Sequence, residues 1–578
     1  MSQLTAGSMS ADGRWVTYES FASDLGLGDT NGTSDVFVRD LITGTNEWIS
    51  TNFFQDAGSA NGGSWPAMRF SLAPARLPVI SGDGRRVAIE AVVKTELATN
   101  GLNLPLVTGL NNQFTLCAFD RVEHTNRFIA SVGPTNKPGP PATPAWSANG
   151  RYLAFQSSWP DPAIPNSAIG QIYFRDLTQG TNVLVSRTPD PLVVTGGSKA
   201  SWGPLLSADG ARVTFLSAAS DLIPSTNLIS GTNLFLWDAA AGMKTLLSVA
   251  PNGDGLGRVS QPALSADGRF AAFLNQTDLY LCGISLQTLS RVATNATAAS
   301  LNGDGRFLAF ECRDALAGDD TNSISDIYVL DRLSNTVVLA SVNLDGTASG
   351  NGKSTSPTVS PDGRYVVFNS QASDLVANDT NGFTDVFLRD LTAGTTLLLS
   401  VNFSASTSGH LLSANPVLSA GGNVVIFESY SSDLTVGDFN ETKDLFVVRL
   451  SAGDSDGDGM ADDWEVAYFG GLARDGTGDF DDDGQSDLAE FRAGTNPTED
   501  HSIFRAFTLS NPNVADGVMV LWNAVPGRTY RVQYKNGIDD PDWTELQGDV
   551  VATSATGAKL DSAAQTTAAR FYRVMALR

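Results

Sequence analysis

The stretch that decides the fold is Ser10-Ala11-Asp12-Gly13-Arg14-Trp15-Val16-Thr17-Tyr18. An Asp-Gly pair between two short apolar runs is a strong hairpin signal. It predicts a type I′ turn, because glycine supplies a positive φ at little cost. The motif returns seven times, at residues 81–89, 147–155, 207–215, 265–273, 300–310, 360–368 and, in a degenerate form, 419–427. Eight hairpins at a nearly regular spacing predict a repeat architecture.

A third alternating run follows the hairpins, for example at 35–40, 171–176 and 385–390, and a fourth follows a turn, for example at 45–50, 181–186 and 395–400. Alternation with a period of two marks these runs as strands. Four antiparallel strands in each radial repeat make a β-propeller blade. The sequence therefore predicts a mostly β chain with an eight-bladed propeller over residues 1–450, with a seven-bladed ring and one irregular hairpin as the alternative.

The Ser-x-Asp-Gly-Arg turn, the apolar strand after it and the later Asp-[Val/Ile]-[Phe/Tyr]-Val-x-Asp-Leu strand resemble the TolB-like propeller repeat, over about residues 1–450. The resemblance implies the fold and little about activity, because propellers carry many functions. The eighth repeat ends at Leu450 without a fourth strand. We expect the segment 2–6 to supply that strand, since such pairing would remove an open edge.

The connections predict which face of the propeller carries function. The first-to-second and third-to-fourth turns are short and lie on one face of an antiparallel blade. The other connections, such as 51–78, 95–113, 160–170 and 187–204, are long and lie on the opposite face. Long loops on a rigid scaffold are where binding residues usually sit. Trp65, Trp159 and Trp202 fall in these loops and are candidate ligand-binding residues, with packing between blades as the alternative.

A second pattern recurs in the loops, Asp29-Thr30-Asn31-Gly32 followed by Asp35, with further copies within 319–326, 374–385 and 433–444. Its oxygens could serve as calcium ligands or as acceptors in Asx turns. No glutamate closes the set, which favours Asx turns. The Arg-Asp dipeptides that end the third strands predict ion pairs within each blade.

The formal net charge of −25 is concentrated in residues 451–500, which hold 15 acidic and 2 basic side chains. A net charge this negative argues against nucleic acid or an anionic membrane as a partner.

Residues 454–465 and 479–490 each match the twelve-residue calcium loop, with glycine at the sixth position. Without a cation, five carboxylates in one loop would repel one another, so calcium is the expected cofactor. The predicted ligands are Asp454, Asp456, Asp458, Met460 (through its carbonyl), Asp462 and Glu465, and Asp479, Asp481, Asp483, Gln485, Asp487 and Glu490.

Helices are expected after the two loops, at 461–469 and 486–493, and there is no room for a helix before the first loop. Trp464, Tyr468, Leu488 and Phe491 are expected to form a small shared core. The short helical EF-hand-like segment 451–501 resembles the dockerin-like and thrombospondin type 3-like calcium modules of secreted proteins. The resemblance, together with the missing helix, implies a structural role for the ion.

The tail, residues 502–578, alternates at 518–522, 528–534 and 570–574 and resembles the small β-sandwich of fibronectin type III-like domains. The cysteines Cys117, Cys282 and Cys312 show no disulfide or zinc spacing and are expected to be buried in strands. No apolar run approaches the length of a membrane span, and the polar start gives no sign of a signal peptide in this chain.

No enzyme constellation stands out. The three histidines fall in different repeats or domains, and no Gly-x-Ser-x-Gly elbow precedes a hydrolase domain. We therefore expect a secreted, cell-surface or periplasmic bacterial protein, a monomer, that binds a protein or glycan ligand without catalysis. The alternatives are a carbohydrate-active hydrolase or lyase with acidic residues at the channel mouth and a purely structural surface module.

Overall fold

The computed structural model describes the chain except for residues 1, 4–6, 23–24, 26–32, 51–52, 56–67, 98–112, 135–143, 159–168, 191, 225–229, 319, 436–437, 439–441, 451–457, 470–473, 494, 501, 503, 511–516, 525–528, 538–542, 553–555, 567–569 and 578. The structure divides into two compact units, Met1–Leu450 and Ser451–Arg578. Of the helices in the described ranges, none has the length and apolar character needed to cross a membrane.

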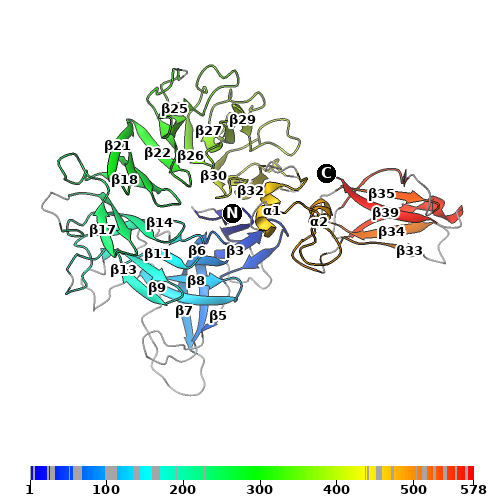
Figure 1. Cartoon of the computed structure of the whole chain (residues 1–578), viewed down its shortest axis with the longest axis horizontal. Helices are drawn as coiled ribbons and strands as arrows, with labels where there is room; N and C mark the ends of the chain where they lie inside the picture. Colours follow the sequence, from blue (N-terminus) through cyan, green and yellow to red (C-terminus); the bar gives the residue numbers. More distant parts are fainter. Residues whose placement is uncertain are drawn as a thin grey trace. The chain divides into compact units, whose positions relative to one another are not determined.

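The first unit contains eight antiparallel sheets that follow one another along the chain (Figure 1). The first sheet contains β1 (Ser2–Gln3), β2 (Trp15–Ser20), β3 (Asp35–Asp40) and β4 (Asn46–Trp48), and the second contains β5 (Phe53–Gln55), β6 (Met68–Ile80), β7 (Arg86–Leu97), β8 (Gln113–Asp120) and β9 (Thr125–Pro134). The third sheet contains β10 (Ala145–Trp146), β11 (Tyr152–Ser157), β12 (Gln171–Asp176) and β13 (Thr181–Leu184), and the fourth contains β14 (Ser201–Leu206), β15 (Arg212–Ser217), β16 (Asn233–Asp238) and β17 (Met243–Leu246).

The other four sheets repeat the same order of strands. The fifth sheet contains β18 (Val259–Leu264), β19 (Phe270–Asn275), β20 (Asp278–Gly283) and β21 (Thr288–Ala293), and the sixth contains β22 (Ala296–Leu301), β23 (Phe307–Cys312), β24 (Asp326–Asp331) and β25 (Thr336–Leu339). The seventh sheet contains β26 (Ser354–Val359), β27 (Tyr365–Ser370), β28 (Asp385–Asp390) and β29 (Thr395–Leu398), and the eighth contains β30 (Ser413–Leu418), β31 (Val424–Ser429) and β32 (Asp444–Arg449). Radially repeated four-stranded sheets make this unit a β-propeller, as the sequence predicted.

The recurring motif forms the turn between the first two strands of each sheet. In the first copy, the Ser10 hydroxyl donates to Asp12 Oδ1 at 2.5 Å and accepts the Trp15 amide at 2.9 Å. Gly13 has a φ of +72°, and its amide donates to the Ser10 carbonyl at 3.1 Å. The expected type I′ turn is wrong, because it requires a positive φ at both central residues and Asp12 does not have one.

In the three sheets whose third strand ends in Arg-Asp, the aspartate (Asp40, Asp176 or Asp390) forms an ion pair within its own sheet, as expected. Its partner, however, is the arginine that follows the turn and not the arginine next to it in sequence. Arg14 contacts Asp40 at 3.0 Å, and Arg364 contacts Asp390 at 2.9 Å. The neighbouring Arg39 instead donates to Asn46 at 3.1 Å. Each pair therefore ties the turn to the end of the third strand.

The turns of neighbouring sheets are hydrogen-bonded to one another. Ala11 N–H donates to the Gly82 carbonyl at 2.8 Å, and Ala148 N–H donates to the Ala208 carbonyl at 2.8 Å. The eighth turn returns to the first, because Gly421 N–H donates to the Ala11 carbonyl at 2.7 Å. The first and eighth sheets also share a core cluster that includes Met9, Val16, Val424 and Ile426.

The expected role of the N-terminal segment is wrong for the described part of it. Ser2 and Gln3 pair with Ser20 and Glu19 as the innermost strand of the first sheet, and the eighth sheet has three strands in the described residues. The same segment lies beside β32, as the first strand of other sheets lies beside the third strand of the sheet before. β1 is therefore the first strand of the first sheet, and Met9, just before the turn, also pairs with Val16 of β2. Residues 4–6 lie outside the described ranges.

Two of the expected long loops are partly strand. β6 and β7 extend to 13 and 12 residues, so the hairpin of the second sheet continues into the ranges 51–78 and 95–113, and β5 pairs with β6 of this hairpin.

The apolar core lies between successive sheets. Aromatic rings of the second and third strands stack there in pairs such as Phe155 with Tyr173 and Phe368 with Phe387. All three cysteines are buried and free, as expected.

The second unit begins with two short helices, α1 (Asp462–Phe469) and α2 (Asp487–Ala493), close to the two predicted. Two sheets follow, β33 (Ala506–Ser510), β34 (Val518–Asn523) and β38 (Thr556–Asp561), then β35 (Thr529–Lys535), β36 (Thr544–Glu545), β37 (Val550–Val551) and β39 (Phe571–Leu577). Trp522 and Tyr530 are fully buried between them. Helix α2 contacts β39, so the helices and the sheets of this unit pack together.

Candidate metal centre

The second acidic loop, residues 479–490, lies wholly within the described part of the chain. Of the first loop, residues 458–460 and Glu465 are described, whereas Asp454 and Asp456 lie outside the described ranges. Asp462 begins α1, and its side chain is not among those described. The second loop therefore shows the geometry of all twelve positions.

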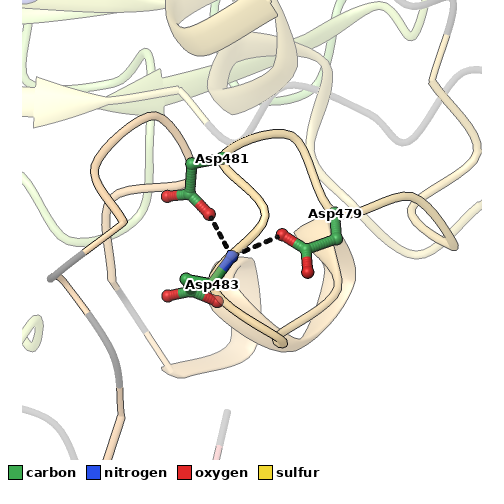
Figure 2. Close-up of side chains that lie close together, drawn as sticks. All are labelled: Asp479, Asp481 and Asp483. Carbon is green, nitrogen blue, oxygen red and sulfur yellow. Dashed lines mark hydrogen bonds between the residues drawn. The ribbon is translucent and has the colours of Figure 1, made fainter.

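Three carboxylates of the second loop gather around one backbone amide (Figure 2). One oxygen each of Asp479, Asp481 and Asp483 lies within 4.8 Å of the other two. The Asp483 amide donates to Asp479 Oδ1 at 3.2 Å and to Asp481 Oδ1 at 3.3 Å. Gly484, with a φ of +94°, donates its amide to Asp479 Oδ2 at 2.8 Å. A glycine at the sixth position is what lets the chain turn this sharply.

Glu490 closes the loop from helix α2 and is fully buried. Its Oε1 accepts the Thr495 hydroxyl at 3.2 Å, whereas Oε2 is buried without a partner, as are Asp481 Oδ2 and Asp483 Oδ2. Burial and the charges of Asp481 and Asp483 raise the pKa of Glu490 to about 7. Burial, with the Asp483 and Asp479 charges, also raises the pKa of Asp481. Buried carboxylate oxygens without partners are costly, so the second loop concentrates uncompensated negative charge.

Asp487, the predicted ligand at the ninth position, is engaged elsewhere. Its Oδ2 contacts Arg474 Nε at 2.5 Å, and its Oδ1 accepts the Phe480 amide at 3.1 Å. Sequence reasoning missed Arg474, although it is the only basic residue between the two loops. Gln485 is the predicted ligand at the seventh position, through its backbone carbonyl, and its backbone amide donates to Asp483 Oδ1 at 2.7 Å.

The first loop repeats this geometry where it is described. Gly459 has a φ of +94°, equal to that of Gly484. The Met460 amide donates to Asp458 Oδ1 at 2.8 Å, and Asp458 Oδ2 is buried without a partner. Glu465 is fully buried in α1, as Glu490 is in α2. The described residues of the first loop therefore have the same local geometry as their counterparts in the second loop.

The predicted core between the two loops is present. The Trp464 ring lies 5.0 Å from Tyr468 and 5.2 Å from Phe491, measured between ring centroids. Met460 is 1% exposed. A Cβ on Gly459 would lie 3.3 Å from Leu488 Cδ1, so the turn of the first loop packs against the helix of the second.

The candidate tryptophans are not brought together. Trp65 and Trp159 lie outside the described ranges. Trp202 lies in strand β14, so its expected place in a loop is wrong. It is half-buried and packs against a core cluster that includes Val259 and Phe273. This favours packing between sheets, and contact of Trp202 with a ligand stays a prediction.

The Asp/Asn loops of the propeller act as hydrogen-bond acceptors where they are described. Asn381 Oδ1 accepts the Phe383 amide at 2.6 Å, and Asp320 Oδ1 accepts the Asn322 amide at 3.2 Å. Asp374 Oδ1 accepts the backbone amide of Asn351 at 2.8 Å, and Asn351 lies in the link from the preceding sheet. Asx turns thus account for these copies, and calcium there stays a prediction.

The histidines do not converge on one site. His124 is exposed, with Nδ1 3.6 Å from Glu47, and His410 Nδ1 lies 2.8 Å from Asp433 Oδ1. His501 lies outside the described residues. Within the described part of the chain, the one group of converging metal-ligating side chains is Asp479, Asp481 and Asp483 of the second loop.

No family model matches the sequence, and no curated protein matches it. Among solved structures, an oligogalacturonate lyase from Vibrio parahaemolyticus is 13% identical, with a TM-score of 0.36 over 66% of this chain and 88% of the lyase. The propeller domain of the Trilobed protease from Pyrococcus furiosus is 12% identical, with a TM-score of 0.35 over 65% and 95%. A protein described as TolB from Agrobacterium tumefaciens is 18% identical, with a TM-score of 0.27 over 49% and 86%. These neighbours are β-propeller proteins, and similarity this low says nothing of activity.

Proposed function

We propose that the chain is a calcium-binding β-propeller protein whose segment 451–501 holds two calcium ions. The observation that carries the proposal is the second loop. Three aspartates converge there, the charges of Asp481 and Asp483 help to raise the pKa of the fully buried Glu490, and three carboxylate oxygens of the loop, one of them on Glu490, have no hydrogen-bond partner. Asp479, Asp481, Asp483, Glu490 and the Gln485 carbonyl would hold one ion, and the matching residues of the first loop would hold the other.

The donor set favours calcium over other metals. Residues 454–490 contain neither histidine nor cysteine, which zinc and copper prefer. Calcium accepts six to eight oxygens in flexible geometry, as a loop of aspartates with a closing glutamate provides, whereas magnesium demands a strict octahedron. A bound calcium would supply the positive charge that the buried carboxylates lack and would have a structural role.

We further propose that the propeller is a closed ring of eight blades. The hydrogen bond from Gly421 to Ala11 and the core shared by the first and eighth sheets support closure. The second unit would then comprise the paired EF-hand-like loops and a fibronectin type III-like sandwich at 502–578. An extracellular, cell-surface or periplasmic place suits the loops, since extracellular calcium modules bind with dissociation constants of roughly 10⁻⁴–10⁻³ M.

The long-loop face is the proposed surface for a protein or glycan ligand, bound without catalysis. Its exposed aromatic side chains support this. Phe21, Phe383, Phe403 and Tyr430 are 62%, 45%, 65% and 37% exposed and all lie in connections on this face. The exposed apolar residues of the opposite turns, Val122, Leu286 and Leu333, are aliphatic. Aromatic rings are enriched where proteins bind one another and can stack on sugars.

Calorimetric titration of calcium into the chelator-treated chain tests the metal proposal. Two ions should bind, and E465Q and E490Q should each abolish or severely weaken one site, because each removes the closing ligand. Binding should also protect the segment 451–500 from proteolysis. A chain that takes up no calcium, or is cleaved equally with and without chelator, would refute the proposal.

A glycan array and a binding screen test the ligand face. F383S and F403S should remove binding, whereas L286S and L333S, at side chains on the opposite turns that are more exposed, should not. The reverse result would show that the wrong face was chosen.

A further inference from the structure

The shortest side-chain contact of the second loop, from Arg474 to Asp487, does not involve its three converging aspartates. Asp487 is fully buried, with Arg474 Nε 2.5 Å from its Oδ2. Its Oδ1 accepts the amide of Phe480 at 3.1 Å, and its own amide donates to the Gly478 carbonyl at 2.7 Å. The first residue of helix α2 is therefore tied, through both side chain and backbone, to the residues that enter the loop.

Arg474 is itself held in place by its surroundings. Its guanidinium carbon lies 5.0 Å from the Phe469 ring centroid and 5.1 Å from that of Phe480. A Cβ on Gly478 would lie 2.5 Å from Arg474 Nη2, so only glycine leaves room for the guanidinium there. Phe469 ends α1, and Phe480 is the second residue of the loop. One side chain thus joins the end of the first helix to the entry and exit of the second loop.

A calcium loop needs its two ends held together, which a pair of flanking helices usually does. The entry to this loop, residues 474–478, is not helical. We infer that Arg474 is a positioning residue for the second calcium site, and that its ion pair with Asp487 takes the place of the missing helix. Asp487 then holds the loop closed and does not bind the ion directly. This inference rests on the proposed function.

Two effects of removing Arg474 have opposite signs, which makes the inference testable. Loss of a nearby positive charge should by itself strengthen calcium binding, and so should release of Asp487 as an extra ligand. Loss of the positioning contact should weaken it, since changing residues that orient metal ligands typically costs 10–100-fold in affinity. The inference predicts that the second effect prevails.

The experiment is calcium titration calorimetry of the full chain carrying E465Q, so that only the second loop is measured. R474Q should raise the dissociation constant about tenfold or more. R474K, which keeps the charge but not the planar guanidinium, should fall between R474Q and the parent. R505Q removes an exposed charge of the same unit and is the matched control, expected to bind as the parent does.

D487N tests the role of the carboxylate. Added to R474Q, it should cause little further loss, because both changes break one contact and their effects are not additive. A parent that binds calcium while R474Q binds it equally or more tightly overturns the inference alone. A further large loss on adding D487N does the same, since it would make Asp487 a ligand. A parent without calcium binding overturns the proposed function as well. If E465Q does not fold, the second binding event of the chain with an intact first loop decides between the same outcomes.

Discussion

Replacing Asp326 by asparagine should stabilise the propeller. Asp326 is fully buried at the start of β24, where Oδ1 accepts the Ser341 hydroxyl at 2.6 Å and Oδ2 has no partner. Asn233 occupies the equivalent place in β16. Its Oδ1 likewise accepts the Ser248 hydroxyl, at 3.0 Å, and its Nδ2 donates to the Ser230 carbonyl at 3.0 Å. The fourth sheet thus uses an amide where the sixth uses a carboxylate.

The size of the effect follows from the pKa of Asp326. Burial, with the charges of Asp320 and Asp374, raises that pKa to about 6. A shift of about two pH units from the ordinary value corresponds to about 3 kcal/mol of destabilisation when the group is ionised. A raised carboxyl pKa means that the folded state binds the proton more tightly, so this cost is present above pH 6 and vanishes as the pH falls towards 4. D326N should therefore gain about 1–3 kcal/mol at pH 8 and almost nothing at pH 4.

Thermal unfolding of the full chain at pH 8, 6 and 4 measures the gain. For a unit of this size, 3 kcal/mol corresponds to roughly 3 °C in the melting temperature. The matched control is N233D, which sets a carboxylate against the Ser230 carbonyl and should destabilise most at pH 8. A D326N chain that melts lower than the parent, or whose gain is the same at every pH, would contradict the reasoning.

Two further substitutions test local geometry. Asp482 is exposed, has a φ of +60° and occupies the loop position that Gly457 holds in the first loop. D482G should therefore raise the free energy of unfolding of the ion-free second unit by about 1 kcal/mol in urea, whereas D482A should not. Equal effects of the two substitutions would exclude backbone strain at this position. G13A would place a Cβ 2.6 Å from Val424 Cγ2 across the closure of the ring, whereas G180A, with nearly the same φ, meets nothing within 4 Å. G13A should lower the melting temperature clearly more than G180A, and equal losses would mean that the first and eighth sheets do not pack as described.

The repeat and its strands could be predicted from the sequence because the signals are local. Asp-Gly at the turn and the alternation of runs such as 385–390 depend on neighbours in the chain, and β28 has those same bounds. The N-terminal segment was predicted wrongly because either the first or the eighth sheet could take it as a strand, and the sequence does not say which one a short polar segment joins. The turn type was missed because the Gly13 amide donates to the Ser10 carbonyl, which makes Gly13 the last residue of the turn and places Ala11 and Asp12 at its centre.

The acidic loops were found from spacing alone, since the positions of aspartate and glycine within twelve residues determine the turn. The different role of Asp487 could not be found in this way. It depends on Arg474, 13 residues earlier, reaching a buried carboxylate across Gly478. Trp202 shows the same limit. A tryptophan followed directly by Gly203 and Pro204 has the appearance of a loop residue, and the strand that contains it is identified only by its pairing with β15.

The central proposal, a chain that holds two calcium ions in two similar loops, is tested most directly by counting the ions. Native mass spectrometry of the full chain, desalted and then titrated with calcium in the millimolar range, gives the number bound per molecule. Two ions are expected for the parent, one for E465Q, one for E490Q and none for the double variant. A parent that carries no specifically bound calcium, or an E490Q chain that still carries two ions, would contradict the proposal.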